Sequence, residues 1–527
     1  MYKRIFVIVI ASCLSALLTG CRKQQLSTGD VGQTLDSLAR KLVWTEHRLA
    51  EERWAEQTTG SADSLAFFEG LRKYLLSDAE AFSLFTRDGS RVEGEENRRR
   101  LELIGNFLRQ GVVEYGRAIE PLKDTLTDAI EGAVTSLDGQ RMTALELARA
   151  WQRDADRGRR ESAWRLYGAL GAGWAEQLEQ LVRQRNRQAQ ANGYNGYFAM
   201  AFSGFPGDQV DYSKILQAVD SLTAGPYREA LGALRANSPA GAAEFWDLAF
   251  YGTTSARMVD RYLNLDTLTD AVRSGLAGMG FEIERLPVYT QLTETPGGPP
   301  VVALMMVNPG KDVRMIADFG EGWLSARELL NGFGQSLYAL QVTDSDALFR
   351  AIQEPAMASG MRQVMDYLCR DASWLTANTA LPPAEAGRYA EASRRQTAIE
   401  LRLMLFGAAF EYEVYRQPGR DVNGLYWELF EQYLDLPAHD ELKPWALDKG
   451  FVTTPFQAQY DLLGAVIAGQ TLAYLEATNG SVIGNPETRS FLVQNYFRFG
   501  SRYAWTDLLE RGTGEKFNPG YLLTLVR

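Results

Sequence analysis

Amphipathic helical periodicity extends over most of this chain of 527 residues and constrains its fold more than any other feature. Apolar residues recur every three to four positions through long segments that are separated by turn-forming residues. We expect helices over residues 35–56, 65–76, 98–111, 161–193, 211–235, 397–416, 458–475 and 486–510, the last with Asn485 as its N-cap. No sequence repeat, low-complexity tract or linker interrupts the pattern, which therefore predicts a mainly α protein.

One stretch departs from the helical pattern. The turn cluster at 295–300 separates two short runs typical of strands, 288–292 and 301–307, and a third run at 313–317 follows Asn308-Pro309-Gly310. These runs predict a small β-ribbon around 288–317, just before a helix that begins near Ser325. Two interpretations are equally open: an edge strand that binds an extended peptide by backbone pairing, or a ribbon that covers the core.

The first residues read as an export signal. Lys3 and Arg4 precede an apolar run over 5–18, which is shorter than the ~20 residues of a membrane-spanning helix. The run ends in Leu18-Thr19-Gly20-Cys21, small residues before a cysteine, as in bacterial lipoproteins. We expect a lipoprotein signal peptide at 1–20, a lipid on Cys21 and a tether over 21–37; the alternative is an ordinary signal peptide. Because Arg22 rather than Asp follows the cysteine, we expect attachment at the periplasmic face of the outer membrane in the cell envelope.

Charge and rare residues exclude several classes of protein. The net charge of −11 becomes −13 once Lys3 and Arg4 leave with the signal, which argues against nucleic acid as a partner. After processing, Cys369 is the one cysteine left without lipid, and we expect it to be a buried apolar residue rather than a nucleophile. The two histidines, His47 and His439, stand far apart among charged neighbours typical of surfaces. An HExxH zinc motif, with two histidines one helical turn apart, is therefore absent.

A set of short motifs nevertheless keeps a recognisable order. They are Val43-Trp44-Thr45-Glu46 with Trp54 and Thr58-Thr59, Ala163-Trp164 with Asn186, Ala189, Gly193-Tyr194 and Tyr197, Asp312-Val313-Arg314-Met315, Tyr426-Trp427-Glu428-Leu429, and the segment from Lys449 to Phe456. Together they resemble the angiotensin-converting-enzyme family of peptidyl-dipeptidases, which are zinc metallopeptidases; the related oligopeptidase family is the nearest alternative. The resemblance covers residues 38–525 and implies one peptidase-like domain: an elongated, two-lobed helical body with a deep interhelical cleft beside the β-ribbon.

The resemblance also locates the helix that would carry the zinc motif. Residues 328–338 resemble the family's His-Glu-x-Gly-His helix, with Gly334 and Tyr338 in register. Asn331 and Gln335 replace the two ligand histidines, and Gly332 replaces the general-base glutamate. A carboxamide is a poor donor to zinc compared with an imidazole at ~2.0–2.1 Å, and glycine has no group that deprotonates a metal-bound water. We therefore expect no zinc cofactor and no intact catalytic residue.

Other family positions are altered or retained as follows. The best local match to the third zinc ligand is Glu354, for which a carboxylate in the first turn of a helix is the plain alternative. The histidine and tyrosine that stabilise the oxyanion in the family correspond to Phe451 and Gln459, with Tyr460 as a stand-in for the tyrosine if the register shifts by one. Lys449 matches the lysine that pairs with a substrate's terminal carboxylate, unless it is simply a solvated surface charge.

Three functions remain open from the sequence. The first is an inactive pseudo-peptidase that binds peptides or a protein partner in the former active-site cleft, with Asn331 and Gln335 one turn apart on one helical face as hydrogen-bonding groups. The second is an active metallopeptidase with an atypical metal site, for instance a hard cation held by Asp344, Asp346 and Glu354. The third is an envelope scaffold without a ligand cleft.

Overall fold

The computed structural model describes residues 31–203, 211–237, 243–286, 288–294 and 301–526. Over these ranges the protein is mainly helical, as the periodicity predicts, and both of its sheets are small. The predicted signal peptide, Cys21 and the turn cluster at 295–300 lie outside the described residues. Among the described helices, none combines the length and the apolar character that crossing a bilayer requires.

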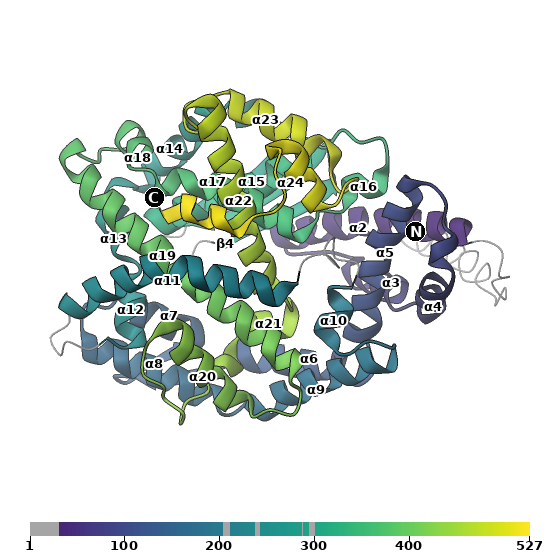
Figure 1. The fold of residues 1–527 in the computed structure, drawn as a ribbon, viewed down its shortest axis with the longest axis horizontal. Coiled ribbons are helices and arrows are strands. Elements are labelled where there is room, and N and C mark those ends of the chain that lie inside the picture. Colours follow the sequence, from purple (N-terminus) through teal and green to yellow (C-terminus); the bar gives the residue numbers. More distant parts are fainter. Residues whose placement is uncertain (1–30, 204–210, 238–242, 287, 295–300, 527) are drawn as a thin grey trace, which may run out of the picture.

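The helices follow one another closely along the chain. Up to residue 278 they are α2 (Val31–Thr59), α3 (Leu65–Leu76), α4 (Ala79–Asp88), α5 (Glu95–Glu114), α6 (Glu120–Glu131), α7 (Ala144–Arg153), α8 (Arg157–Gly171), α9 (Ala175–Ala191), α10 (Tyr197–Ala201), α11 (Tyr212–Asn237), α12 (Phe245–Tyr251), α13 (Thr254–Val259) and α14 (Leu265–Gly278). Beyond the ribbon they are α15 (Trp323–Leu340), α16 (Ala347–Ala351), α17 (Pro355–Arg370), α18 (Ala372–Asn378), α19 (Pro383–Arg416), α20 (Val422–Leu434), α21 (Lys449–Thr453), α22 (Gln457–Asn479), α23 (Glu487–Asn495) and α24 (Trp505–Thr513). In Figure 1 the 34-residue α19 runs through the middle, with α23 and α24 on one side of it and α8 and α20 on the other.

Three predicted helices differ from the structure in instructive ways. Helix α2 begins at Val31 and buries Leu35, so the folded body includes residues 31–37, which the sequence assigned to the tether. The segment 161–193 forms two helices rather than one, because α8 ends at Gly171, where a Cβ atom would lie 2.0 Å from the Lys443 carbonyl oxygen. The segment 486–510 is likewise divided, with a turn at Gly500, whose φ is +55°, between α23 and α24.

The predicted β-ribbon is a three-stranded sheet. Strands β3 (Val288–Glu294), β4 (Val301–Asn308) and β5 (Asp312–Phe319) lie in the order β3-β5-β4. The last strand, β5, is central and pairs parallel with β3 and antiparallel with β4, whose register is irregular between Met305 and Asn308. Strand β4 is therefore an edge strand, and α2 packs against it.

A second, two-stranded sheet was not predicted. Strands β1 (Val134–Leu137) and β2 (Gln140–Thr143) form an antiparallel hairpin. Asp138 and Gly139 join them, both with positive φ, and the Asp-Gly pair is a strong hairpin signal that the sequence did contain.

Helices α15, α17 and α22 pack together beside the larger sheet. Their close approach depends on small residues at the contacts. A Cβ atom on Gly334 of α15 would lie 2.7 Å from the Met361 carbonyl oxygen of α17, and one on Gly464 of α22 would lie 2.6 Å from the Ser359 hydroxyl oxygen. The helix predicted to carry the former zinc motif is thus fixed between the sheet and α17. Cys369, at the end of α17, is fully buried, as predicted.

Candidate functional site

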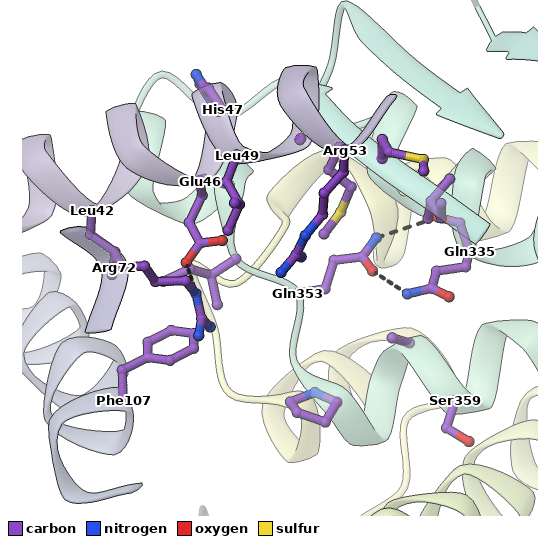
Figure 2. A pocket seen from close by; sticks show the side chains of 18 of the residues that line it. Leu42, Glu46, His47, Leu49, Arg53, Arg72, Phe107, Gln335, Gln353 and Ser359 are labelled. Atoms are coloured by element: carbon purple, nitrogen blue, oxygen red, sulfur yellow. Dashed lines mark hydrogen bonds and ion pairs between the residues drawn. The ribbon is translucent and has the colours of Figure 1, made fainter. Parts of the chain in front are cut away.

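A pocket of about 470 Å³ lies between α2, β4, α15 and the start of α17. Its apolar wall combines Leu42 and Leu49 of α2, Phe107 of α5, Ile352, and the β4 residues Leu304, Met305 and Met306. The remaining wall combines polar side chains with small apolar residues such as Ala50, Pro355 and Ala358, and it comes mostly from α2, α15 and α17. Figure 2 shows the polar side chains Glu46, Arg53, Arg72, Gln335 and Gln353 around this space.

Gln335, one of the two amides that the resemblance aligns with zinc-ligand histidines, lines this pocket. Its side-chain nitrogen donates to Oε1 of Gln353 at 3.2 Å, and the side-chain nitrogen of Gln353 donates to the Gln335 backbone oxygen at 3.3 Å (Figure 2). Gln353 lies in the connection between α16 and α17 and also lines the pocket. The sequence did not single out Gln353, because its partner, Gln335, lies 18 residues earlier, on α15.

Asn331 sits one turn before Gln335 but has a different role. Its side chain hydrogen-bonds to Glu328 on the same helix, and it is not part of the pocket wall. Burial raises the pKa of Glu328, and the hydrogen bond from Asn331 partly offsets this effect. Asn331 and Gln335 therefore lie one turn apart on α15, but of the two it is Gln335 that lines the pocket, so the two amides do not bind one ligand together.

Gly332, which the resemblance aligns with a general-base glutamate, is covered by the sheet. A Cβ atom there would lie 2.6 Å from Cγ1 of Val302 in β4 and 2.8 Å from Sδ of Met315 in β5. A glutamate side chain has no room at this point in the present packing. The absence of a side chain at Gly332 therefore allows the sheet to pack closely on α15.

Glu354 is held away from the pocket by a buried arginine. It stands at the N-cap of α17 and forms an ion pair with Arg99 of α5, which also donates to the Ser501 carbonyl at 2.9 Å. Burial raises the pKa of Glu354, and the charge of Arg99 opposes that shift. The α17 side chains that do reach the pocket wall are Pro355, Ala358, Ser359 and Arg362.

The three carboxylates considered for a hard cation are each paired with a different arginine. Glu354 pairs with Arg99, Asp346 with Arg100 and Asp344 with Arg502. Within the ranges that the structure describes, no group of three or more histidine, cysteine, aspartate or glutamate side chains is arranged to hold a metal ion. Glu354 and Asp346 thereby join α5 to the segments around α16 and α17, and Asp344 joins the segment before α16 to Arg502, between α23 and α24.

The segment from Lys449 to Phe456 is held against the body of the protein by the buried Arg185. Lys449, the first residue of α21, is half-exposed and paired with Glu131 of α6, outside the pocket wall. Phe451 is buried against Tyr415 with ring centroids 5.7 Å apart. The carbonyl oxygens of Phe451 and Val452 both accept hydrogen bonds at 2.7 Å from Arg185, which is fully buried on α9.

Arg185 is also part of a buried charge pair. It donates to both carboxylate oxygens of Glu114, at 2.7 and 2.8 Å, and Lys123 lies 2.6 Å from the same carboxylate. Although burial opposes ionisation, these two cations lower the pKa of Glu114 to about 2. The pair joins α5, α6, α9 and α21.

Gln459 and Tyr460 lie at the start of α22, where Gln459 is buried and Tyr460 is partly buried. Gln459 donates to the Ala408 carbonyl at 3.1 Å, and Tyr460 stacks on Phe202 at 5.6 Å. Burial raises the pKa of Tyr460, and the nearby charge of Glu354 raises it further. Neither side chain lines the pocket.

A carboxyl that the sequence did not indicate holds this segment in place. Glu411 of α19 accepts a hydrogen bond at 2.8 Å from the backbone nitrogen of Phe456, a residue with φ of +70°. Burial raises the pKa of Glu411 to about 8, against the opposing effect of that hydrogen bond. The carboxyl is therefore protonated in the folded protein at neutral pH.

The two histidines occupy partly buried positions rather than the open surface. His47 lies on α2 at the margin of the pocket, where burial and the nearby Arg350 lower its pKa. His439 lies 3.0 Å from Glu244 and packs near the rings of Trp246 and Trp427. The charged residues beside His439 in the sequence predicted a surface position, which is wrong because Glu244 and Trp246, from a distant part of the chain, pack near it.

Comparison with protein-family models and with curated proteins finds no match. Fold and site together define a mainly helical protein with an amide-lined pocket at the edge of a small sheet.

Proposed function

We propose that this protein is a non-catalytic binder of peptides, related to the peptidyl-dipeptidases and carried by a lipid on Cys21 in the cell envelope. The observation that carries the proposal is the pocket beside β4, whose polar wall presents the amides of Gln335 and Gln353. Amides both donate and accept hydrogen bonds, which suits the alternating groups of a peptide backbone.

The edge strand supports an extended ligand. Among the described strands, β4 pairs with β5 alone, and its residues Leu304, Met305 and Met306 contribute to the pocket wall. A peptide laid along such an edge gains main-chain hydrogen bonds and places alternate side chains in the apolar part of the pocket. The cavity of about 470 Å³ holds a few residues rather than a folded domain.

The absence of catalysis rests on the chemistry of the altered positions. Gly332 offers no carboxylate, Asn331 is engaged with Glu328, and Glu354 is engaged with Arg99. Hydrolysis of a peptide by a zinc enzyme requires both a metal-bound water and a base that deprotonates it. A zinc assay combined with a dipeptide-release assay tests this part, and stoichiometric zinc with turnover would contradict it.

Capture of a pool of random pentapeptides by the immobilised protein tests binding. Ala50→Trp fills the pocket from α2 and should abolish capture, whereas Ala55→Trp, half-buried on the same helix and outside the pocket wall, should preserve it. Circular dichroism of both variants checks that they fold. Absence of capture by the unmodified protein would refute the proposal and favour a scaffold.

A further inference from the structure

The charged residues of the pocket wall differ in how fully they are paired. Arg72 lies 2.6 Å from Glu46 and donates to the Tyr115 hydroxyl at 2.8 Å. Arg362 lies 2.7 Å from Asp461, which also accepts from Ser359 at 2.7 Å. These two arginines are therefore held in short internal ion pairs.

Arg53 is the weakly paired cation of this wall. Its nearest carboxylate is that of Glu69 on α3, at 3.5 Å, with half of each side chain exposed to solvent. An ion pair of this length and exposure contributes little free energy. Figure 2 shows the Arg53 side chain extending from α2 into the pocket and ending beside Gln353. An excess of positive charge therefore faces the cavity at this point.

We propose, on the basis of the proposed peptide-binding function, that Arg53 binds a carboxylate of the ligand and makes the pocket selective for peptides that carry one there. The planar guanidinium matches a carboxylate with two parallel hydrogen bonds. Lys449, the family's position for this role, is paired with Glu131 outside the pocket wall. The amides of Gln335 and Gln353 then lie next to the bound carboxylate, and Leu49 and Phe107 supply apolar contacts.

The carboxylate comes from the C-terminus of the peptide or from an aspartate or glutamate side chain, and three peptide pools distinguish these sources. The first pool has free C-termini and no acidic residues, the second is C-terminally amidated and contains Asp and Glu, and the third is amidated without them. The unmodified protein should capture the first or the second pool at least tenfold better than the third.

Variants of the pair Arg53–Glu69 supply the matched controls. Arg53→Gln should reduce capture of the preferred pool about tenfold and leave the third pool unchanged, and Arg53→Lys should fall between. Glu69→Gln removes the internal competitor and should improve capture two- to fivefold. Arg40→Gln, exposed on the same helix and outside the pocket wall, should change nothing.

The outcomes separate this inference from the proposed function. Equal capture of all three pools would overturn the role of Arg53 while leaving peptide binding intact. Equal effects of Arg53→Gln and Arg40→Gln would also overturn it. Capture of none of the pools would refute peptide binding itself.

Discussion

Replacement of Glu411 by glutamine should stabilise the protein in a strongly pH-dependent manner. The carboxyl is buried in α19, and its pKa is raised from 4.5 to about 8. In the unfolded chain it ionises near pH 4.5, whereas in the folded protein it stays protonated until about pH 8. The folded state therefore loses stability relative to the unfolded state as pH rises through this window, and none of this loss is present below pH 4.5.

The size of this loss of stability follows from the difference between the pKa of Glu411 in the folded and in the unfolded protein. Each unit of pKa difference corresponds to about 1.36 kcal/mol, so the loss reaches about 3 kcal/mol at pH 7 and about 5 kcal/mol above pH 8. Glutamine keeps an oxygen that accepts the hydrogen bond from the Phe456 backbone and carries no charge at any pH. Glu411→Gln should therefore be close to neutral at pH 5 and stabilising by a few kcal/mol at pH 8.

Urea unfolding of both proteins at pH 5, 6.5 and 8 measures this difference directly. Glu391→Gln, at an exposed position of the same helix, controls for the loss of one negative charge. A stability difference between Glu411→Gln and the unmodified protein that stays constant across the three pH values would refute the reasoning. Destabilisation at pH 8 would refute it as well.

Three further predictions concern the site and its supports. Arg185→Met leaves Glu114 buried with Lys123 as its remaining cation and should cost about 3–5 kcal/mol in urea unfolding, against less than about 0.5 kcal/mol for Arg183→Met on the same helix. Gly332→Ala places a methyl group 2.6 Å from Val302 and should cost about 1–3 kcal/mol, so that an unchanged unfolding midpoint would contradict the packing described. Excess zinc should leave the melting temperature unchanged, because a ligand stabilises only a protein that binds it; a rise of several degrees would show that the folded protein binds zinc and would contradict this expectation.

The sequence predicted those helices and strands well whose positions depend on residues that are close together in the chain. The three strands of the larger sheet were placed within a few residues, because alternating apolar residues and the turn signals around them lie next to one another in the chain. Helix α3 was placed at its observed bounds for the same reason. The Asp138-Gly139 hairpin was missed although its signal is local, since only two short strands flank it.

The sequence alone determined the chemistry of the helix that the resemblance aligns with a zinc motif: two amides and a glycine stand at residues 331, 332 and 335 whatever the packing. Tertiary structure decided which of these side chains reaches the pocket, because Asn331 bonds to Glu328 within α15 whereas the other two positions meet groups from other segments. Gln335 pairs with Gln353, and the sheet closes over Gly332. Glu354 pairs with Arg99, 255 residues earlier, and Lys449 pairs with Glu131, 318 residues earlier. Charge pairing over such separations depends on how helices pack, and no pattern within one segment of sequence specifies it.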